Sequence, residues 1–295
     1  MHYSVKLIIK ITGVGLFFFY WMAPGVFAAE KIDVFVSILP LKYLVEQVGG
    51  DFVDVSVMVK PGADPHTYEP KPKQMVSLSK AAAYFTVGIT FEDVWLPKFK
   101  TANPNMIIIH ADENIEKIPM NTRSFYSRPE HDHGLLDPHI WTSPPLVKTI
   151  CKNILNGLVK IDAARQPVYT ANHETFDKEI NRIHGELESI FEGKKGLSFM
   201  VFHPAWGYFA KTYGLNQIPI EIDGKKSKPA QLKRLIEYAR NHGIRIIFVQ
   251  PQVAHQNAKI IAKAIDGELV QADPLAYDWT ENIRKQADKF KSALK

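Results

Sequence analysis

The chain has 295 residues, of which 46% are hydrophobic and 23% are charged. This is an ordinary globular balance, and the length suits two domains that each bury a core. The net charge of +5 is small, and two of the positive residues, Lys6 and Lys10, lie in an N-terminal leader. A charge this small gives no reason to expect a nucleic-acid partner.

The first 28 residues have the pattern of a secretory signal peptide. Lys6 and Lys10 precede an apolar run, residues 11–22, that is too short to span a bilayer comfortably. The sequence Val26-Phe27-Ala28 then provides small residues for cleavage after Ala28 or Ala29. The alternative is an uncleaved N-terminal anchor. Because no second apolar span follows, we expect the mature protein to be soluble.

The single cysteine, Cys151, lies in a stretch with helical apolar periodicity, residues 146–158. It can form no internal disulfide, and we expect a buried, unreactive core thiol. A secreted chain with neither a disulfide nor a lipid-attachment site fits a bacterial periplasm.

The first part of the chain alternates short apolar strands with helices. Strands rich in β-branched residues are expected at 31–37, 53–59, 83–87 and 106–110. Helices are expected at 40–48, 73–82 and 92–99. This alternation predicts a βα lobe with a mainly parallel sheet.

Two longer helices follow a polar stretch. The first is expected from Ser143 to about Asp162, and the second from Gln166 to about Glu192. At 1.5 Å per residue the second helix would be about 40 Å long, enough to cross between lobes as a stiff connector.

The rest of the chain repeats the βα pattern. Strands are expected at 198–202, 216–222, 244–250 and 268–271, and helices at 206–213, 229–241, 257–265 and 279–294. The predicted fold class is therefore α/β, with two βα lobes and mainly parallel sheets joined by one long helix. The predicted boundaries are a signal peptide at 1–28, an N-terminal lobe at 29–165, a linking helix at 166–192 and a C-terminal lobe at 193–295.

Four loops carry side chains that can bind a metal, each at a strand end or a turn. They are Gly62-Ala63-Asp64-Pro65-His66, Asp137-Pro138-His139-Ile140-Trp141, Phe202-His203-Pro204-Ala205-Trp206 and Ala272-Asp273-Pro274-Leu275. Ligands of parallel α/β sheets gather at the carboxyl ends of strands, so two lobes facing each other can bring such loops together. Three imidazoles and one carboxylate can close a four-coordinate site for a divalent metal. Spacing alone fits ordinary packing between domains equally well.

These motifs resemble those of the zinc- and manganese-binding solute-binding proteins of bacterial ABC importers. The resemblance extends to Glu69-Pro70 after the first motif and to Gly207-Tyr208-Phe209 after the third, and it covers nearly all of the mature chain. Two departures are Pro204, where the family usually has an acid, and Gln250-Pro251-Gln252, where it often shows one.

The resemblance implies two α/β lobes joined by a long helix, with the metal between them. It implies His66, His139, His203 and Asp273 as ligands, and a membrane permease of a metal ABC importer as the partner of a periplasmic, non-enzymatic and monomeric receptor. Three nitrogens and one carboxylate favour Zn²⁺, with Mn²⁺ or Fe²⁺ as alternatives.

Two other functions remain open at this stage. A secreted zinc hydrolase would need an open coordination position, which three histidines and a water would leave if Asp273 were not a ligand. A surface adhesin could use the metal structurally. Separately, His131, Asp132 and His133 resemble a short version of the His-rich loop of zinc-type members, and either collect metal loosely or form a solvated polar loop.

Overall fold

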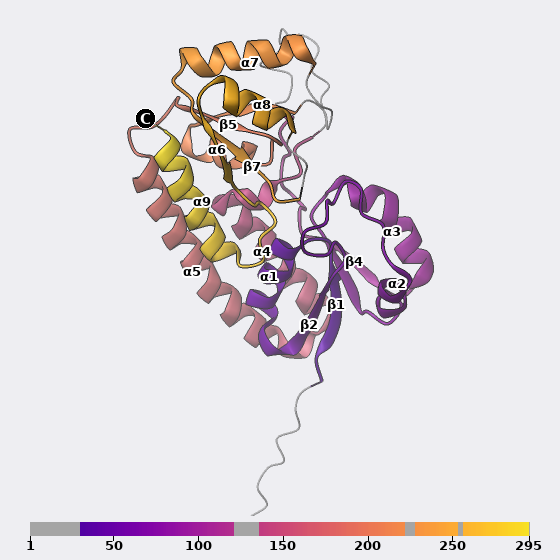
Figure 1. Ribbon diagram of the computed structural model, residues 1–295. Helices are drawn as coiled ribbons and strands as arrows, with labels where there is room; N and C mark the ends of the chain where they lie inside the picture. The colour runs from indigo at the N-terminus through magenta and orange to yellow at the C-terminus, as the bar shows by residue number, and fades with distance from the viewer. Residues whose placement is uncertain (1–29, 121–135, 222–227, 253–255, 295) are drawn as a thin grey trace, which may run out of the picture. The chain divides into compact units, whose positions relative to one another are not determined.

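The computed structural model describes residues 30–120, 136–221, 228–252 and 256–294 (Figure 1). The chain divides into two units, residues 1–30 and 31–295, and the fold described here is that of the second unit. The predicted signal peptide and the loop with His131 and His133 fall outside the described residues.

The N-terminal sheet contains four parallel strands in the order β2-β1-β3-β4. The strands are β1 (Ile32–Val36), β2 (Val53–Val57), β3 (Ala83–Thr86) and β4 (Ile107–His110). The helices that connect them are α1 (Leu39–Gly49), α2 (Pro72–Leu78) and α3 (Thr90–Ala102). The next strand is added on one side of β1 for β2 and on the other side for β3. Parallel sheets bind ligands in the crevice at such a switch point.

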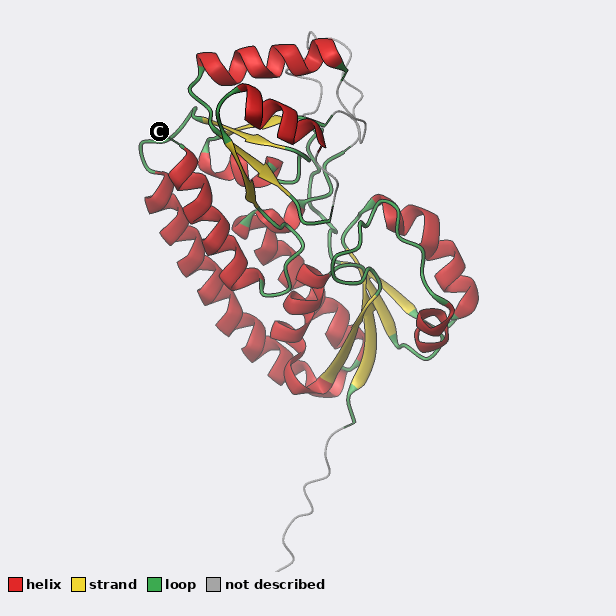
Figure 2. Cartoon of the chain, viewed as in Figure 1, coloured by secondary structure: helices red, strands yellow, loops and turns green. Residues whose placement is uncertain are grey.

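The C-terminal sheet repeats this topology in the order β6-β5-β7-β8, again all parallel. Its strands are β5 (Ser198–Val201), β6 (Asn216–Pro219), β7 (Ile246–Val249) and β8 (Glu268–Gln271). Its connecting helices are α6 (Gly207–Tyr213), α7 (Pro229–Asn241) and α8 (Gln256–Ala264). The two separate groups of strands are visible in Figure 2, and they confirm the predicted two-lobe α/β fold.

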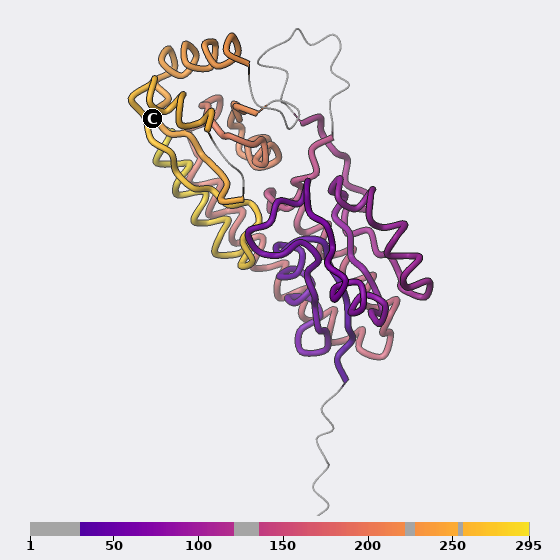
Figure 3. The backbone as a smooth tube through the Cα atoms, turned by 45° about the vertical axis from the view of Figure 1, so that its right-hand side comes forward, coloured from indigo at the N-terminus to yellow at the C-terminus, as the bar shows by residue number. Residues whose placement is uncertain are grey.

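Three helices connect and support the two sheets. They are α4 (Pro144–Ile161), the 26-residue α5 (Gln166–Phe191) and the C-terminal α9 (Trp279–Ala293). Helices α5 and α9 run side by side in both Figure 1 and Figure 3. The chain crosses between the sheets on α5, and α9 runs along it in the same direction, since Trp279 packs on Phe176 and Lys194, just past α5, donates to Leu294 O.

One hydrophobic core extends from the first sheet, along α4 and α5, to one face of the second sheet. Phe290 of α9 is central to its far end, since its ring lies 4.7 Å from that of Phe199 and 4.6 Å from that of Phe248. A smaller core fills the other face of the second sheet under α7 and α8. Cys151 is buried in the first core, as expected, and burial raises the pKa of its thiol.

The helices that differ most from the sequence prediction are α2 and α3. Helix α2 ends at Leu78 rather than residue 82, because Ala82 N already donates to Asp33 O of β1. Helix α3 begins at Thr90 and continues past Pro97 to Ala102. No helix in the described ranges is both long and apolar enough to cross a membrane.

Candidate metal centre

Three of the four predicted motifs share one local turn. In each Asp-Pro-X segment, the aspartate Oδ1 accepts the backbone N–H two residues later, at 2.9 Å. The pairs are Asp64 with His66, Asp137 with His139 and Asp273 with Leu275. An aspartate that bonds its own backbone in this way fixes a turn locally, and the intervening proline stiffens it. The sequence therefore folds three of the four loops by the same local hydrogen bond.

His139 is the most strongly held of the predicted ligands. The residue is 6% exposed, and its Nδ1 donates to Asp137 Oδ1 at 2.7 Å, the same oxygen that accepts its backbone N–H. A carboxylate can only accept, so Nδ1 carries the proton and the lone pair of Nε2 is left for a metal. Gly207 permits this arrangement, since a Cβ there would come within 2.5 Å of Asp137 Oδ2.

His203 has the same kind of support from a residue that the sequence analysis missed. It lies two residues past β5, is 8% exposed, and its Nδ1 lies 2.7 Å from Glu221 Oε2. The sequence pattern predicts a strand over residues 216–222, which would include Glu221, whereas β6 ends at Pro219. An acid just past the carboxyl end of a strand was the available signal. Glu221 holds His203 as Asp137 holds His139.

His66 is more exposed and more weakly held. Its Nδ1 lies 3.3 Å from the hydroxyl of Thr90, at the start of α3. Desolvation lowers the pKa of the His66 ring, and the positive charge that His203 can carry lowers it further. The neutral ring, which is the metal-binding form, is therefore favoured.

The backbone just before Thr90 is held by the buried side chain of Glu92. Glu92 accepts backbone N–H groups from Val87, Gly88 and Ile89, and the hydroxyl of Ser37. Burial raises the pKa of Glu92 to about 7. These hydrogen bonds to Glu92 fix the conformation of the loop that leads into Thr90.

Two of the three ring pairs lie at a spacing that suits a shared metal. The ring centroid of His203 is 5.4 Å from that of His66 and 5.3 Å from that of His139. An imidazole nitrogen about 2.0 Å from zinc puts its ring centroid about 3.2 Å away, so two rings at a tetrahedral angle have centroids about 5 Å apart. In the part of the chain that is described, no three His, Cys, Asp or Glu side chains form a closed ligand cluster.

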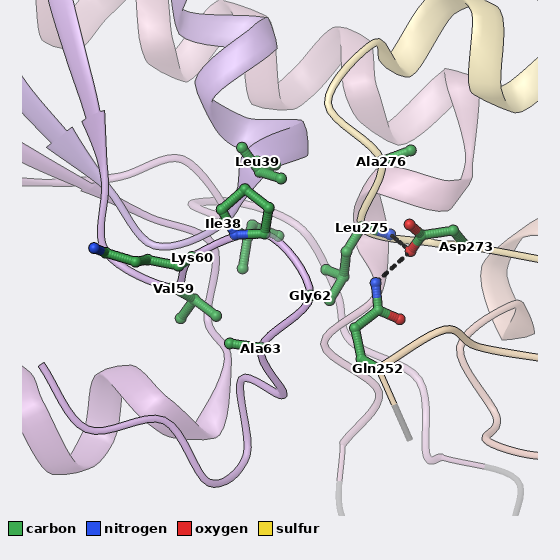
Figure 4. Close-up of a pocket in the computed structure, with 11 residues that line it drawn as sticks. Ile38, Leu39, Val59, Lys60, Gly62, Ala63, Gln252, Asp273, Leu275 and Ala276 are labelled. Carbon is green, nitrogen blue, oxygen red and sulfur yellow. Dashed lines mark hydrogen bonds between the residues drawn. The ribbon is translucent and has the colours of Figure 1, made fainter. Parts of the chain in front are cut away.

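Asp273 lies on the rim of the second sheet, two residues past β8. Its Oδ1 accepts Leu275 N and also Gln252 Nε2, at 2.9 and 2.8 Å (Figure 4). It lines a small pocket of about 80 Å³, which Gly62 and Ala63 of the first histidine loop also line. Asp273 therefore faces the loop of His66, and its Oδ1 is already engaged.

The loop after β7 adds another residue to this rim. Gln252 donates to Asp273, while its own Oε1 is buried and has no hydrogen-bond partner within the described structure. All four strands of the second sheet thus end near a polar residue of this region: His203, Glu221, Gln252 and Asp273.

Comparison with protein families identifies one match over most of the chain. A model described as ZnuA, the periplasmic component A of a zinc-uptake complex, matches residues 34–293. Among curated proteins, the zinc-binding protein AdcA of Streptococcus pyogenes is 25% identical, over 97% of this chain and 59% of its own length. The chain thus spans about three-fifths of that relative. The high-affinity zinc uptake system protein ZnuA of Bacillus subtilis is 26% identical, over 80% of this chain and 77% of its own.

Solved structures give the same picture. A crystal structure of ZnuA is 39% identical, with a TM-score of 0.83 over 90% of this chain and 100% of the other. A ZnuA deletion mutant with zinc bound has the same identity and TM-score, over 90% and 98% of the two chains. The laminin-binding protein of Streptococcus agalactiae is 24% identical with a TM-score of 0.78, which shows a shared fold.

Proposed function

Because the chain belongs to the ZnuA family of periplasmic zinc-uptake components, we propose that it captures zinc outside the cytoplasmic membrane and delivers it to an ABC permease. The observation that carries this proposal is the group of three imidazoles around His203, two of which have a carboxylate on Nδ1. Together with Asp273, they provide three nitrogen ligands and one oxygen ligand. Nitrogen-rich sets of this kind suit zinc better than manganese, which prefers oxygen.

Capture follows from the roles of the individual residues. Asp137 and Glu221 hold the Nδ1 protons of His139 and His203, so each ring offers its Nε2. His66 joins from the exposed loop as a neutral ring. Asp273 supplies the negative charge through Oδ2, since its Oδ1 is held by Gln252 and Leu275. A four-coordinate site filled in this way leaves no position for a reactive water, which favours a receptor over a hydrolase.

The cellular setting follows from the family and the leader sequence. Cleavage of residues 1–28 would release the chain into the periplasm, where the loaded monomer would dock on the permease of a metal ABC importer. The N-terminal lobe would be 29–165, the linking helix 166–192 and the C-terminal lobe 193–295. The long helix α5 would allow only small movements of one lobe against the other.

The test is metal competition on protein purified after secretion of the full chain. We expect the stripped protein to take up one zinc ion, with manganese and ferrous iron competing weakly. Each of the variants His66→Ala, His139→Ala and His203→Ala should lower zinc affinity by more than about a hundredfold, beyond the 10- to 100-fold typical of outer-shell residues. Asp273→Asn keeps an acceptor for Leu275 N but removes the charge, so it isolates the role of Asp273 as a ligand.

His242→Ala is the matched control, because this exposed ring stacks on Tyr238 at the end of α7, outside the predicted site. It should bind zinc as the wild type does. Unchanged zinc affinity in all three histidine variants would refute the assignment. Tighter binding of manganese than of zinc would instead identify a manganese receptor.

A further inference from the structure

Two buried tryptophans join the turn that carries His139 to the turn that carries Asp273. The indole Nε1 of Trp141 donates to Pro274 O at 2.7 Å, and the indole Nε1 of Trp279 donates to Trp141 O at 2.7 Å. The side chains of Trp141 and Trp279 are only 3% and 2% exposed. We call this pair of hydrogen bonds the indole clasp.

The clasp acts on the backbone beside both predicted ligands. Trp141 is two residues after His139, and their rings are 5.2 Å apart. Pro274 follows Asp273, whose own carbonyl accepts Asn282 Nδ2 of α9 at 2.8 Å. Two consecutive carbonyls, those of Asp273 and Pro274, are therefore held by side chains, in addition to the two bonds to Asp273 Oδ1.

The segment after Asp273 is anchored to the first part of the chain at further points. Thr280 of α9 bonds the hydroxyl of Tyr43 in α1 at 2.7 Å, and Tyr277 donates to Glu46 of the same helix. Asp273 leaves the second sheet at β8, yet the chain beyond it is fixed against α1 and against Trp141. The distance between His139 and Asp273 is thus set by direct contacts, independently of the long connection through α5.

We propose that Trp141 and Trp279 are positioning residues for metal capture, which hold the Asp273 turn against the His139 turn so that both ligands are in place before zinc arrives. This inference rests on the proposed zinc-binding function. A buried indole N–H requires an acceptor, and a lost bond leaves a carbonyl unsatisfied at the ligand turn itself. Phenylalanine would fill most of the space without donating, so it removes the clasp with little change in packing.

The experiment measures zinc affinity by chelator competition in Trp141→Phe, Trp279→Phe and the control Trp95→Phe. Trp95 lies in α3, stacked on Phe91 and Phe99 and outside the predicted site. We expect each clasp variant to bind zinc about tenfold more weakly, and the control to match the wild type. Asp273→Asn should then cost several-fold less affinity in the Trp141→Phe background than in the wild type, because the two changes act on one ligand.

Clasp variants that lose thermal stability but keep wild-type zinc affinity, with Asp273→Asn costing the same in both backgrounds, would overturn the inference. If Trp141→Phe does not fold, Trp279→Phe decides the question, since it breaks the other bond from a different helix. A wild-type protein that fails to bind zinc in the same titration would refute the proposed function, a result distinct from an inactive clasp.

Discussion

His139 and His203 differ from His66 in the group that lies next to Nδ1 of the ring. Each of the first two rings is buried and has a carboxylate oxygen 2.7 Å from Nδ1. His66 lies on an exposed loop, and its Nδ1 faces the hydroxyl of Thr90, at 3.3 Å. Charge-assisted hydrogen bonds are shorter and about twice as strong as neutral ones, so the first pair is fixed far more firmly.

This difference indicates a division of labour among the proposed ligands. The orientation of His139 and His203 is settled by folding, so little ordering entropy is lost there when zinc binds. His66 must be ordered at the moment of binding, and its lowered pKa keeps the ring ready to coordinate. His139 and His203, the rings held by carboxylates, should therefore contribute most to zinc affinity. The exposed loop of His66 should control the access of zinc to the site.

Among the groups that hold the three rings, the largest expected effect comes from removing the charge of the two carboxylates. Asp137→Asn and Glu221→Gln keep shape and an acceptor oxygen but lose the charge that fixes Nδ1–H. We expect each to weaken zinc binding about 10- to 100-fold, measured by competition with a chromogenic chelator. Asp64→Asn is the matched control, because Asp64 forms the same turn but bonds the backbone of His66. A loss in Asp64→Asn as large as that in Asp137→Asn would show that turn stability matters, and ring orientation does not.

Much of the fold was predictable from the sequence, and the reasons are local. Alternation of β-branched strands with amphipathic helices predicted the strands that form, and Gly214 ends α6 in a left-handed conformation, as a C-terminal glycine should. The end of α2 was missed because the pairing of Ala82 with β1 overrides local helix propensity.

The candidate site was predictable only in part. Asp-Pro-X turns can be recognised in sequence, and they mark His66, His139 and Asp273. The partners of the rings cannot be recognised in this way, because Glu221 and Thr90 meet His203 and His66 only through the sheet topology. The ligand roles of all four residues remain predictions that the zinc titrations test.

A smaller effect is expected in the titration of His66. Its pKa is lowered from 6.5, first by desolvation and then by His203. Between the lowered pKa and 6.5 the folded apo-protein binds fewer protons at His66 than the unfolded chain does. The contribution of His66 to stability therefore falls as pH drops through this window, and is complete only above pH 6.5.

Proton NMR of the His66 ring should show a midpoint below 6.5 in the apo-protein. His203→Ala should move it upward, because the variant opens the surroundings and removes a neighbouring charge. A midpoint at or above 6.5 in the wild type would contradict the lowering of the pKa by desolvation and by His203.

The smallest expected effect is that of Thr90→Val, which removes the hydroxyl behind His66 and keeps the branched shape. A neutral hydrogen bond is worth about 0.5–1.5 kcal/mol, and one as long and exposed as this belongs at the lower end. Zinc affinity should therefore fall only about two- to threefold, with Thr101→Val, on the same helix but bonded to Pro97 O, as the control. A loss as large as that of Asp137→Asn would mean that Thr90 fixes His66 as firmly as the carboxylates fix the other rings, and the proposed division between fixed and late ligands would then be wrong.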